Sequence, residues 1–301
     1  MSEARRVIGI LLHPRETGHE ESLEQSLARA AAHGFATWIC RDEPAAAMAE
    51  HASDTTVLVT IGGDGTFLLG ARLAAPLGIP VLGVNRGQLG FLTDVELGAL
   101  PAAIDDIAAG RHRLVRRSML EVEVPGTDAA DAPLLVDRAL NEVVVKSTGS
   151  NLARIRVEAD DELLGEFDAD GVIVATATGS TAYALSAGGP PVDPRVRAMV
   201  VVPLAPHAVI TRAVVLPEAV SLFVTVVRGR AFAAADGSVQ VALREGTRVT
   251  VRPGADLHVV ELSGSPSFLR RLREKVRFGL PLKESLDEPD WHRATHEQGG
   301  P

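Results

Sequence analysis

The stretch IGGDGTF, residues 61–67, places one aspartate among three glycines. Gly62, Gly63 and Gly65 allow backbone N–H groups to approach a phosphate, because a glycine has no Cβ. A helix beginning here would direct its partly positive N-terminus at that phosphate. Asp64 would repel phosphate, so a carboxylate here fits a residue that handles Mg²⁺ or accepts a proton from an attacking hydroxyl. A tight turn without chemistry explains the stretch equally well.

Two better-known phosphate-binding motifs do not occur in the chain. No segment matches G-x-x-x-x-G-K-[ST], and the glycines of GGDGTFLLG lack the G-x-G-x-x-G spacing of dinucleotide-binding folds. The sequence therefore supports neither a P-loop enzyme nor an ordinary nicotinamide-dependent dehydrogenase.

Two further motifs carry polar residues that suit a nucleotide. In GVNRGQLGFLTDV, residues 83–95, Asn85 lies near Asp64 if the strands that precede the two turns are neighbours. In LNEVVVK, residues 140–146, Asn141 can pair with an adenine or amide edge, and Glu142 can accept from ribose hydroxyls. Taken alone, the first motif also fits a plain strand-to-loop turn, and the second is better explained as an ordinary strand edge.

The stretch DGVIVATATGSTAYALSAGGP, residues 170–190, crowds hydroxyl side chains into a glycine-rich turn after an apolar run. Ser180 or Thr181 is expected to cap a helix that starts here. Tyr183 is the only tyrosine of the chain, and its ring could stack on a base. A capped helix with a half-buried Tyr183 is the alternative without a ligand.

The elements that must position these residues change character along the chain. Short apolar runs at 6–12, 35–40, 56–61 and 79–85 read as strands, and they alternate with helical patterns at 20–34, 66–76 and 96–110. This alternation predicts a parallel, Rossmann-like sheet in an α/β domain over residues 1–114.

The second half predicts a mostly-β domain over residues 115–264. LEVEV and RIRVE alternate with period two, and six more short β-rich runs follow between turn residues. Helical spacing returns in a C-terminal helix, 265–282, expected to end at Gly279 and to pack back on the N-terminal domain. The polar tail, 283–301, is expected to be disordered.

Composition narrows the function classes. The 301 residues carry 30 basic and 39 acidic side chains, a formal net charge of −9, which disfavours nonspecific binding to nucleic acid or anionic membranes. The apolar run before His13 is too short for a signal peptide or a membrane span. A single cysteine, Cys40, allows no intrachain disulfide. We expect a cytoplasmic protein.

Together the motifs resemble the NAD kinase family, whose members make NADP from NAD and ATP. The family pattern is a GGDGT turn, a G-x-N-x-G-x-L-G-F-L segment, an N-E pair and a D-G…T-P-T-G-S-T-A-Y…S-A-G-G-P block. The chain carries them in this order at 62–66, 83–92, 141–142 and 170–190. The GGDGT turn alone is shared with lipid kinases and phosphofructokinases, so the N-E pair and the S-T-A-Y block make the resemblance specific.

The resemblance implies transfer of the ATP γ-phosphoryl group to the 2′-OH of the adenosine ribose of NAD, with Asp64 as the catalytic carboxylate. It implies an ATP phosphate cradle of Gly62, Gly63, Gly65, Thr66 and Asn85. It implies NAD-binding residues Asp64, Gly65, Asn141, Glu142, Arg154, Asp170, Thr181, Ala182, Tyr183, Ala184, Leu185 and Ser186. No protein residue is assigned as a metal ligand, because Mg²⁺ or another divalent cation is expected to arrive with ATP. A homodimer or homotetramer is expected.

The chain departs from the family pattern at two places. Ala177 replaces the proline of T-P-T-G-S, and the D-G-Q pattern near the C-terminal strands reads Asp236, Gly237, Ser238. The sequence leaves open whether Ser238 or Gln240 takes the glutamine's role, whether polyphosphate replaces ATP, and whether NADH is accepted. A lipid or sugar kinase and a non-catalytic dinucleotide sensor are the alternative functions.

Overall fold

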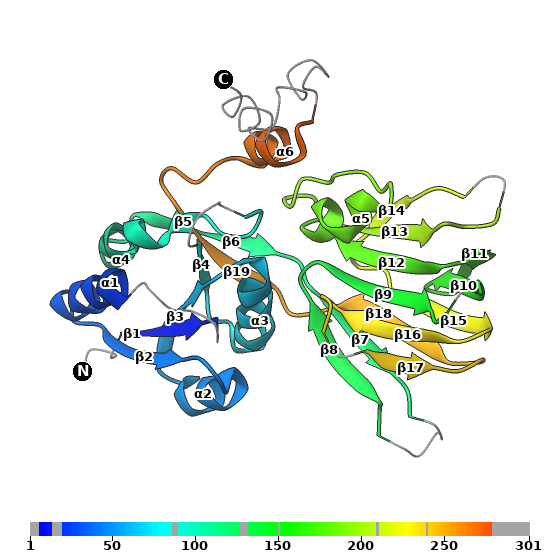
Figure 1. Cartoon of the computed structure of the whole chain (residues 1–301), viewed down its shortest axis with the longest axis horizontal. Coiled ribbons are helices and arrows are strands. Elements are labelled where there is room, and N and C mark those ends of the chain that lie inside the picture. Colours follow the sequence, from blue (N-terminus) through cyan, green and yellow to red (C-terminus); the bar gives the residue numbers. More distant parts are fainter. Residues whose placement is uncertain are drawn as a thin grey trace, which may run out of the picture. The chain divides into compact units, whose positions relative to one another are not determined.

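The computed structural model describes residues 6–13, 20–85, 90–126, 132–149, 151–208, 211–238 and 240–278. The first part of the chain forms a seven-stranded sheet in the order β2-β1-β3-β4-β19-β6, with β5 beside β4 (Figure 1). All of its neighbouring strands are parallel except β6 and β19. Its strands are β1 Val7–Leu12, β2 Ala36–Cys40, β3 Thr55–Ile61, β4 Val81–Asn85, β5 Val95–Glu96, β6 His112–Arg117 and β19 Leu257–Leu262.

Helices cover both faces of this sheet. Alternate residues of β1 belong to two different core clusters, because successive side chains of a strand point to opposite faces. One cluster includes Ala30 and Leu100, and the other includes Met48 and Phe67. The helices on the first face are α1 Glu20–Ala32 and α4 Leu100–Ala108, and those on the second are α2 Pro44–His51 and α3 Asp64–Ala74. The 3₁₀ turns Ala75–Leu77 and Leu97–Ala99 flank α3 and α4.

The second half forms two antiparallel sheets of six strands. One has the order β11-β10-β15-β18-β7-β8, and the other has the order β14-β13-β12-β9-β16-β17. The strands of the first are β7 Leu120–Val124, β8 Leu135–Ala139, β10 Ala153–Ala159, β11 Glu162–Ala169, β15 Leu222–Arg228 and β18 Arg248–Pro253. Those of the second are β9 Glu142–Ser147, β12 Gly171–Thr176, β13 Ala198–Leu204, β14 Val214–Pro217, β16 Ala231–Ala235 and β17 Val241–Leu243.

Strand β12 is buried on both of its faces. Val172 and Val174 join the core cluster that both antiparallel sheets share. Ile173 and Ala175 pack on the other side in a cluster with Ala184 of the short helix α5, Tyr183–Ser186. The 3₁₀ turn Gly179–Thr181 leads from β12 into α5. Burial of both faces gives the segment after Thr176 a firm support.

The predicted fold class is confirmed, with an α/β part followed by a mostly-β part. One strand differs from its predicted place. The segment LHVVEL is a short β-rich run like its neighbours and is expected in the β-rich domain, but β19 pairs with β4 and β6 of the first sheet. Helix α2 was not predicted. Strands β7 and β8 pair in antiparallel fashion, and residues 127–131 between them lie outside the described part.

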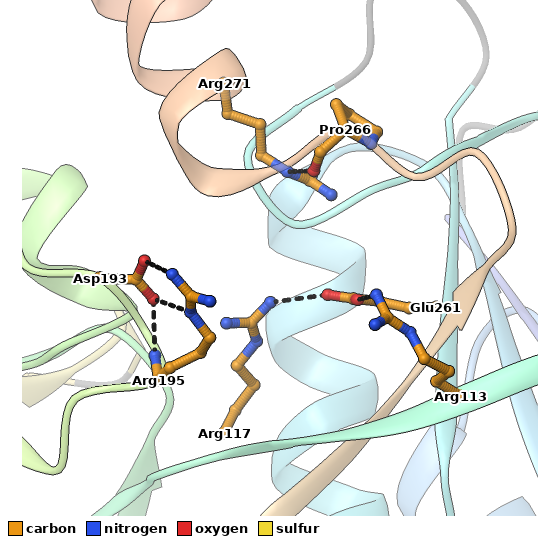
Figure 2. Close-up of polar contacts among 7 residues, drawn as sticks. All are labelled: Arg113, Arg117, Asp193, Arg195, Glu261, Pro266 and Arg271. Atoms are coloured by element: carbon orange, nitrogen blue, oxygen red, sulfur yellow. Dashed lines mark hydrogen bonds and ion pairs between the residues drawn. The ribbon is translucent and has the colours of Figure 1, made fainter.

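The C-terminal helix α6, Phe268–Val276, belongs to a compact unit of its own. The Ser267 hydroxyl accepts a hydrogen bond from the Arg270 N–H at 3.3 Å and caps the helix. The Arg271 guanidinium donates to the Pro266 carbonyl at 3.1 Å (Figure 2). Arg277 follows the helix in the left-handed conformation, φ 56°. The predicted helix end at Gly279 and the tail 283–301 lie outside the described residues.

Candidate active site

The glycine-rich turn after β3 leaves part of its backbone open. The Gly62 N–H donates to the Val84 carbonyl at 3.0 Å, which ties the turn to β4. A Cβ at Gly62 would lie 2.4 Å from the Thr66 hydroxyl oxygen, so packing requires a glycine there. A Cβ at Gly63 or Gly65 would meet nothing within 4 Å, and both glycines are exposed. The first glycine therefore closes the turn, and the other two expose the backbone at the start of α3.

Asp64 is the first residue of α3 and is half-buried. Its Oδ1 accepts from the Leu92 N–H at 3.4 Å, and a Cβ at Gly90 would lie 2.1 Å from the same oxygen. The Gly90 N–H donates to the Thr93 hydroxyl at 2.9 Å. A carboxylate at a helix N-terminus is favoured by the helix dipole. Gly90 and Leu92 of the second glycine-rich segment thus lie against Asp64, although residues 86–89 are outside the described part.

The remaining cradle residues lie close to this turn in the fold. Thr66 is buried, and its hydroxyl has no hydrogen-bond partner among the described residues. Asn85 is the last residue of β4 and is half-buried. Strands β3 and β4 pair in parallel with Ile61 opposite Val84, which brings the ends of both strands to the same edge of the sheet.

The backbone of the Asn141–Glu142 pair is bound by the side chain of Asp236. The Asp236 carboxylate accepts from the N–H groups of Leu140, Asn141 and Glu142 at 2.7, 2.8 and 3.0 Å. In return, the Asp236 N–H donates to the Glu142 carbonyl at 2.9 Å. Asp236 has φ 46°, a left-handed conformation that aspartate tolerates better than most residues. In the sequence Asp236 stands out only as part of the D-G-S variant of the family's D-G-Q pattern, and nothing in that pattern predicts this role.

Glu142 is a buried carboxyl group, 9% exposed. Burial, followed by the nearby charge of Asp236, raises the pKa of Glu142 to about 7, and the Tyr183 N–H opposes the rise by donating to the carboxylate. The Oε2 atom of Glu142 has no partner among the described residues. An unsatisfied buried oxygen of this kind is suited to accept a hydrogen bond from a ligand hydroxyl.

The turn after β12 packs directly on the Asn141–Glu142 pair. The Thr176 N–H donates to the Asn141 carbonyl at 2.9 Å, and a Cβ at Gly179 would lie 2.0 Å from that carbonyl oxygen. Tyr183 is 36% exposed. The structure therefore brings the N-E pair and the T-G-S-T-A-Y block together.

The expected helix cap at Ser180 or Thr181 is wrong. Helix α5 starts after Ala182 without a side-chain cap. The Ser180 hydroxyl donates to the Ala177 carbonyl at 2.7 Å, and the Thr181 hydroxyl donates to the Thr178 carbonyl at 3.2 Å. The preceding 3₁₀ turn offers these hydroxyls nearby carbonyls, so they stabilise that turn instead.

Arg154 and Asp170 lie at the other end of β12. Asp170 precedes Gly171, which pairs with Lys146, whereas Ala175 pairs with Glu142. The Arg154 guanidinium forms two hydrogen bonds with Asp168, at 3.0 and 2.8 Å, and lowers the pKa of that carboxyl group. The six residues of β12 span roughly 20 Å. A ligand that contacts both predicted groups must extend along this strand.

Helix α3 is linked to the segment that carries Asn141. Arg72 of α3 contacts Asp137 of β8 at 3.3 Å, and the Ser238 hydroxyl donates to the same Asp137 oxygen at 2.9 Å. Leu140 is fully buried in one cluster with Phe67 of α3. Ser238 thus uses its hydroxyl within the protein, and Gln240 is exposed.

A second polar cluster contains several arginines whose acidic partners are close by. Arg113 and Arg117 of β6 contact Glu261 of β19 at 3.0 and 3.3 Å (Figure 2). In the loop after α5, Arg195 forms two side-chain bonds with Asp193, at 2.9 and 2.7 Å, and lowers the pKa of Asp193. Since these charges pair with one another, the cluster is a structural network.

Within the described part of the chain, no three His, Cys, Asp or Glu side chains gather as a metal site. No helix in the same residues is long and apolar enough to cross a membrane.

The order of these elements and motifs matches known proteins. The ATP-NAD kinase N-terminal domain matches residues 4–112, and the ATP-NAD kinase C-terminal domain matches residues 140–260. An NAD kinase of Heliobacterium modesticaldum is 43% identical over 227 residues, which cover 74% of this chain and 79% of that protein. This chain belongs to the NAD kinase family. An NAD kinase of Moorella thermoacetica is 39% identical, over 77% of this chain and 71% of its own length.

Solved structures show the same fold at lower identity. Yeast NADH kinase, complexed with NADH, superposes with a TM-score of 0.81 at 23% identity, over 93% of this chain and 90% of that one. An NAD kinase from Archaeoglobus fulgidus, in complex with ATP, has a TM-score of 0.68 at 24% identity, and the match covers 86% of this chain and 94% of that one. Family membership confirms the resemblance predicted from the motifs and displaces the lipid and sugar kinase alternative.

Proposed function

We propose that this chain transfers the γ-phosphoryl group of ATP to the 2′-OH of the adenosine ribose of NAD, with Asp64 facing that hydroxyl. Family membership supports the reaction. One observation of the structure carries the assignment of Asp64. Its carboxylate is held by Leu92 and Gly90 at the start of α3, beside the open backbone of Gly63 and Gly65.

One group of residues would then bind ATP, and a second group would bind NAD. The ATP phosphates would approach the turn at Gly62, Gly63, Gly65, Thr66 and Asn85, where N–H groups at a helix N-terminus suit an anion. The adenosine half of NAD would bind at Asn141, Glu142 and the segment 181–186, with Tyr183 available for stacking. Arg154 and Asp170 would contact only a distant part of an extended NAD molecule.

The chemistry needs positioning more than a strong base. Phosphoryl transfer passes through a loose transition state, so alignment and charge neutralisation carry most of the catalysis. An aspartate is too weak a base to ionise an alcohol beforehand. Asp64 would orient the hydroxyl and accept its proton late in the transfer.

A divalent cation fits this site as part of the ATP complex. Mg²⁺ in phosphotransferases is usually held by one or two carboxylates together with substrate phosphates, and Asp64 supplies one carboxylate beside the open turn. When bound, the cation would neutralise phosphate charge. The protein's own part would be to hold the Asp64 carboxylate in place through Leu92 and Gly90.

The deciding experiment measures NADP formation by the purified chain with NAD, ATP and Mg²⁺, followed by an NADP-specific dehydrogenase. Product that disappears on chelation and is absent without ATP is expected. Parallel reactions with NADH and with polyphosphate define the acceptor and donor. Binding of NAD by calorimetry without any product would contradict the proposal and support a dinucleotide sensor.

Self-association and a cytoplasmic location remain expectations for this chain. Strands β8, β11, β14 and β17 lie at the edges of the two antiparallel sheets, and exposed edges can pair with another copy. Analytical ultracentrifugation of the purified chain would show whether a dimer or tetramer forms.

A further inference from the structure

Four polar side chains connect helix α3 with the turn after β16, which binds the backbone of Asn141 and Glu142. We name this group the brace, and its members are Arg72, Asp137, Asp236 and Ser238. We propose that the brace sets the position of the Asn141–Glu142 pair relative to Asp64, with Asp236 as its principal positioning residue. This inference rests on the proposed function, since it gives the two substrate-binding segments a common support.

Asp236 binds the backbone of the Asn141–Glu142 segment through several hydrogen bonds. Its carboxylate accepts from three consecutive N–H groups, from Leu140 to Glu142. With the Asp236 N–H to the Glu142 carbonyl, four hydrogen bonds join one residue to that segment. Charge-assisted bonds to several N–H groups fix a backbone more strongly than neutral ones. The direction of the Asn141 and Glu142 side chains therefore depends on Asp236.

Asp236 is also connected with α3. Ser238 follows Asp236 in the same turn, and its hydroxyl donates to the Asp137 carboxylate, which also contacts Arg72. The Arg72 charge acts on Asp236 as well, because it opposes the rise that burial causes in the pKa of Asp236. Arg72 lies in the last turn of the helix that Asp64 begins.

An apolar contact runs beside the polar one. Leu140, whose N–H is bound by Asp236, is buried in one cluster with Phe67 and Ala71 of α3. The burial of Leu140 and the ion pair of Arg72 and Asp137 therefore both join this segment to α3. Alignment of the acceptor hydroxyl with Asp64 depends on both, since a misplacement of about 1 Å can cost about 10²-fold in rate.

The test compares Asp236→Asn with Asp160→Asn as a matched control. Asp160 is also a left-handed aspartate, φ 50°, whose carboxylate accepts from a backbone N–H, that of Ser221 at 2.9 Å. It lies in the turn between β10 and β11. Asp236→Asn should lower kcat/KM for NAD by about 10- to 100-fold and leave KM for ATP within about twofold. Asp160→Asn should change neither.

A second pair of variants addresses Arg72. Arg72→Met should lower kcat/KM for NAD by about three- to tenfold, Arg72→Lys should recover most of the loss, and the effects of Arg72→Met and Asp236→Asn should not multiply. Hydrogen exchange of the amides at 140–142 should quicken in Asp236→Asn and in Arg72→Met, with unchanged exchange in the core strand β12.

The outcomes separate the two proposals. Unchanged kcat/KM for NAD in Asp236→Asn, or an equal loss of kcat/KM for NAD and for ATP, would overturn the brace. In that case NADP formation by the parent chain would still uphold the proposed function. If the parent chain makes no NADP, the proposed function fails, and the exchange rates at 140–142 still decide the brace. Exchange that stays at the parent rate in both variants would then refute it.

Discussion

The turn that carries Asp64 and the turn that carries Glu142 treat their backbone N–H groups in opposite ways. At the first turn, Gly63 and Gly65 are exposed and have open space where a Cβ would be. At the second, Asp236 accepts from three consecutive N–H groups. The first turn therefore presents exposed backbone, to which we propose the ATP phosphates bind, whereas the N–H groups of the second turn are bound within the protein and hold the segment of Asn141 and Glu142.

The two acidic residues differ in the same sense. Asp64 is half-buried at a helix N-terminus and one of its oxygens accepts from Leu92. Glu142 is buried beside a second carboxylate, which keeps its pKa at about 7. A residue that must receive a proton from a substrate needs access, while a residue that binds a hydroxyl can be buried. The comparison therefore predicts chemistry at the first turn and binding at the second.

The largest expected effect is at Asp64. Asp64→Asn should lower kcat by about 10²–10⁴-fold, because the amide cannot accept the hydroxyl proton. NAD affinity measured by calorimetry should stay within a factor of about three, since less than one hydrogen bond's net free energy is changed. Near-normal turnover of the purified variant would show that Asp64 does not take part in the phosphoryl transfer. The proposed difference between a reacting turn and a binding turn would then be wrong.

The next largest effect is expected from a substitution that crowds the Asp64 carboxylate. Gly90→Ala introduces a Cβ about where the Asp64 Oδ1 lies, so the carboxylate must move, and kcat should fall by about 10²-fold. Gly165→Ala is the control, because its Cβ would meet Phe167 at an ordinary 3.7 Å. A Gly90→Ala enzyme as active as the control would show that Asp64 is not held by this loop.

Glu142 should affect stability through pH. Its folded pKa of about 7 lies above the ordinary 4.5, so the unfolded chain releases the proton first, and the free energy of unfolding falls as pH rises from about 4.5 to 7. Glu142→Gln should remove this fall and raise the free energy of unfolding above pH 7 by on the order of 2 kcal/mol. Urea titrations at pH 5 and pH 8 measure it.

The exposed Glu162 provides the control for that experiment as Glu162→Gln. Equal pH slopes in the parent chain and in Glu142→Gln would show that folding does not raise the pKa of Glu142. The proposed division between a binding carboxyl and a reacting one would then lose its electrostatic basis.

The smallest expected effect is at Gly65. Gly65→Ala places a Cβ in open space within the first turn of α3, so the free energy of unfolding should rise by about 0.5–1 kcal/mol. KM for ATP should rise by about tenfold, because the added methyl group would hinder a phosphate from reaching the backbone N–H groups of the turn, and a tenfold loss corresponds to about one hydrogen bond's net free energy. Gly98→Ala, another glycine with open space, is the control. An unchanged KM for ATP would place the phosphates elsewhere.

Sequence patterns predicted most elements, and their failures have physical causes. Period-two alternation predicted β7 and β10, short β-rich runs predicted strands such as β12, and the alternation of strands with helices predicted the parallel sheet. Helix α2 was missed because its alanine-rich segment lacks a strong apolar period. Strand β19 was expected to pair within the β-rich domain but joins the first sheet, since periodicity identifies a strand but not the strand with which it pairs.

The candidate site shows the same division. The motifs alone indicated the family and predicted which residues would face a phosphate and a dinucleotide, because glycine, carboxylate and amide groups at fixed local spacing suit those ligands. Only the tertiary structure placed Gly90 against Asp64, which lies 26 positions before it, and bound Asp236 to the N–H of Leu140, 96 positions away in the chain. Contacts between residues so far apart depend on how whole sheets pack, and no local pattern records that packing.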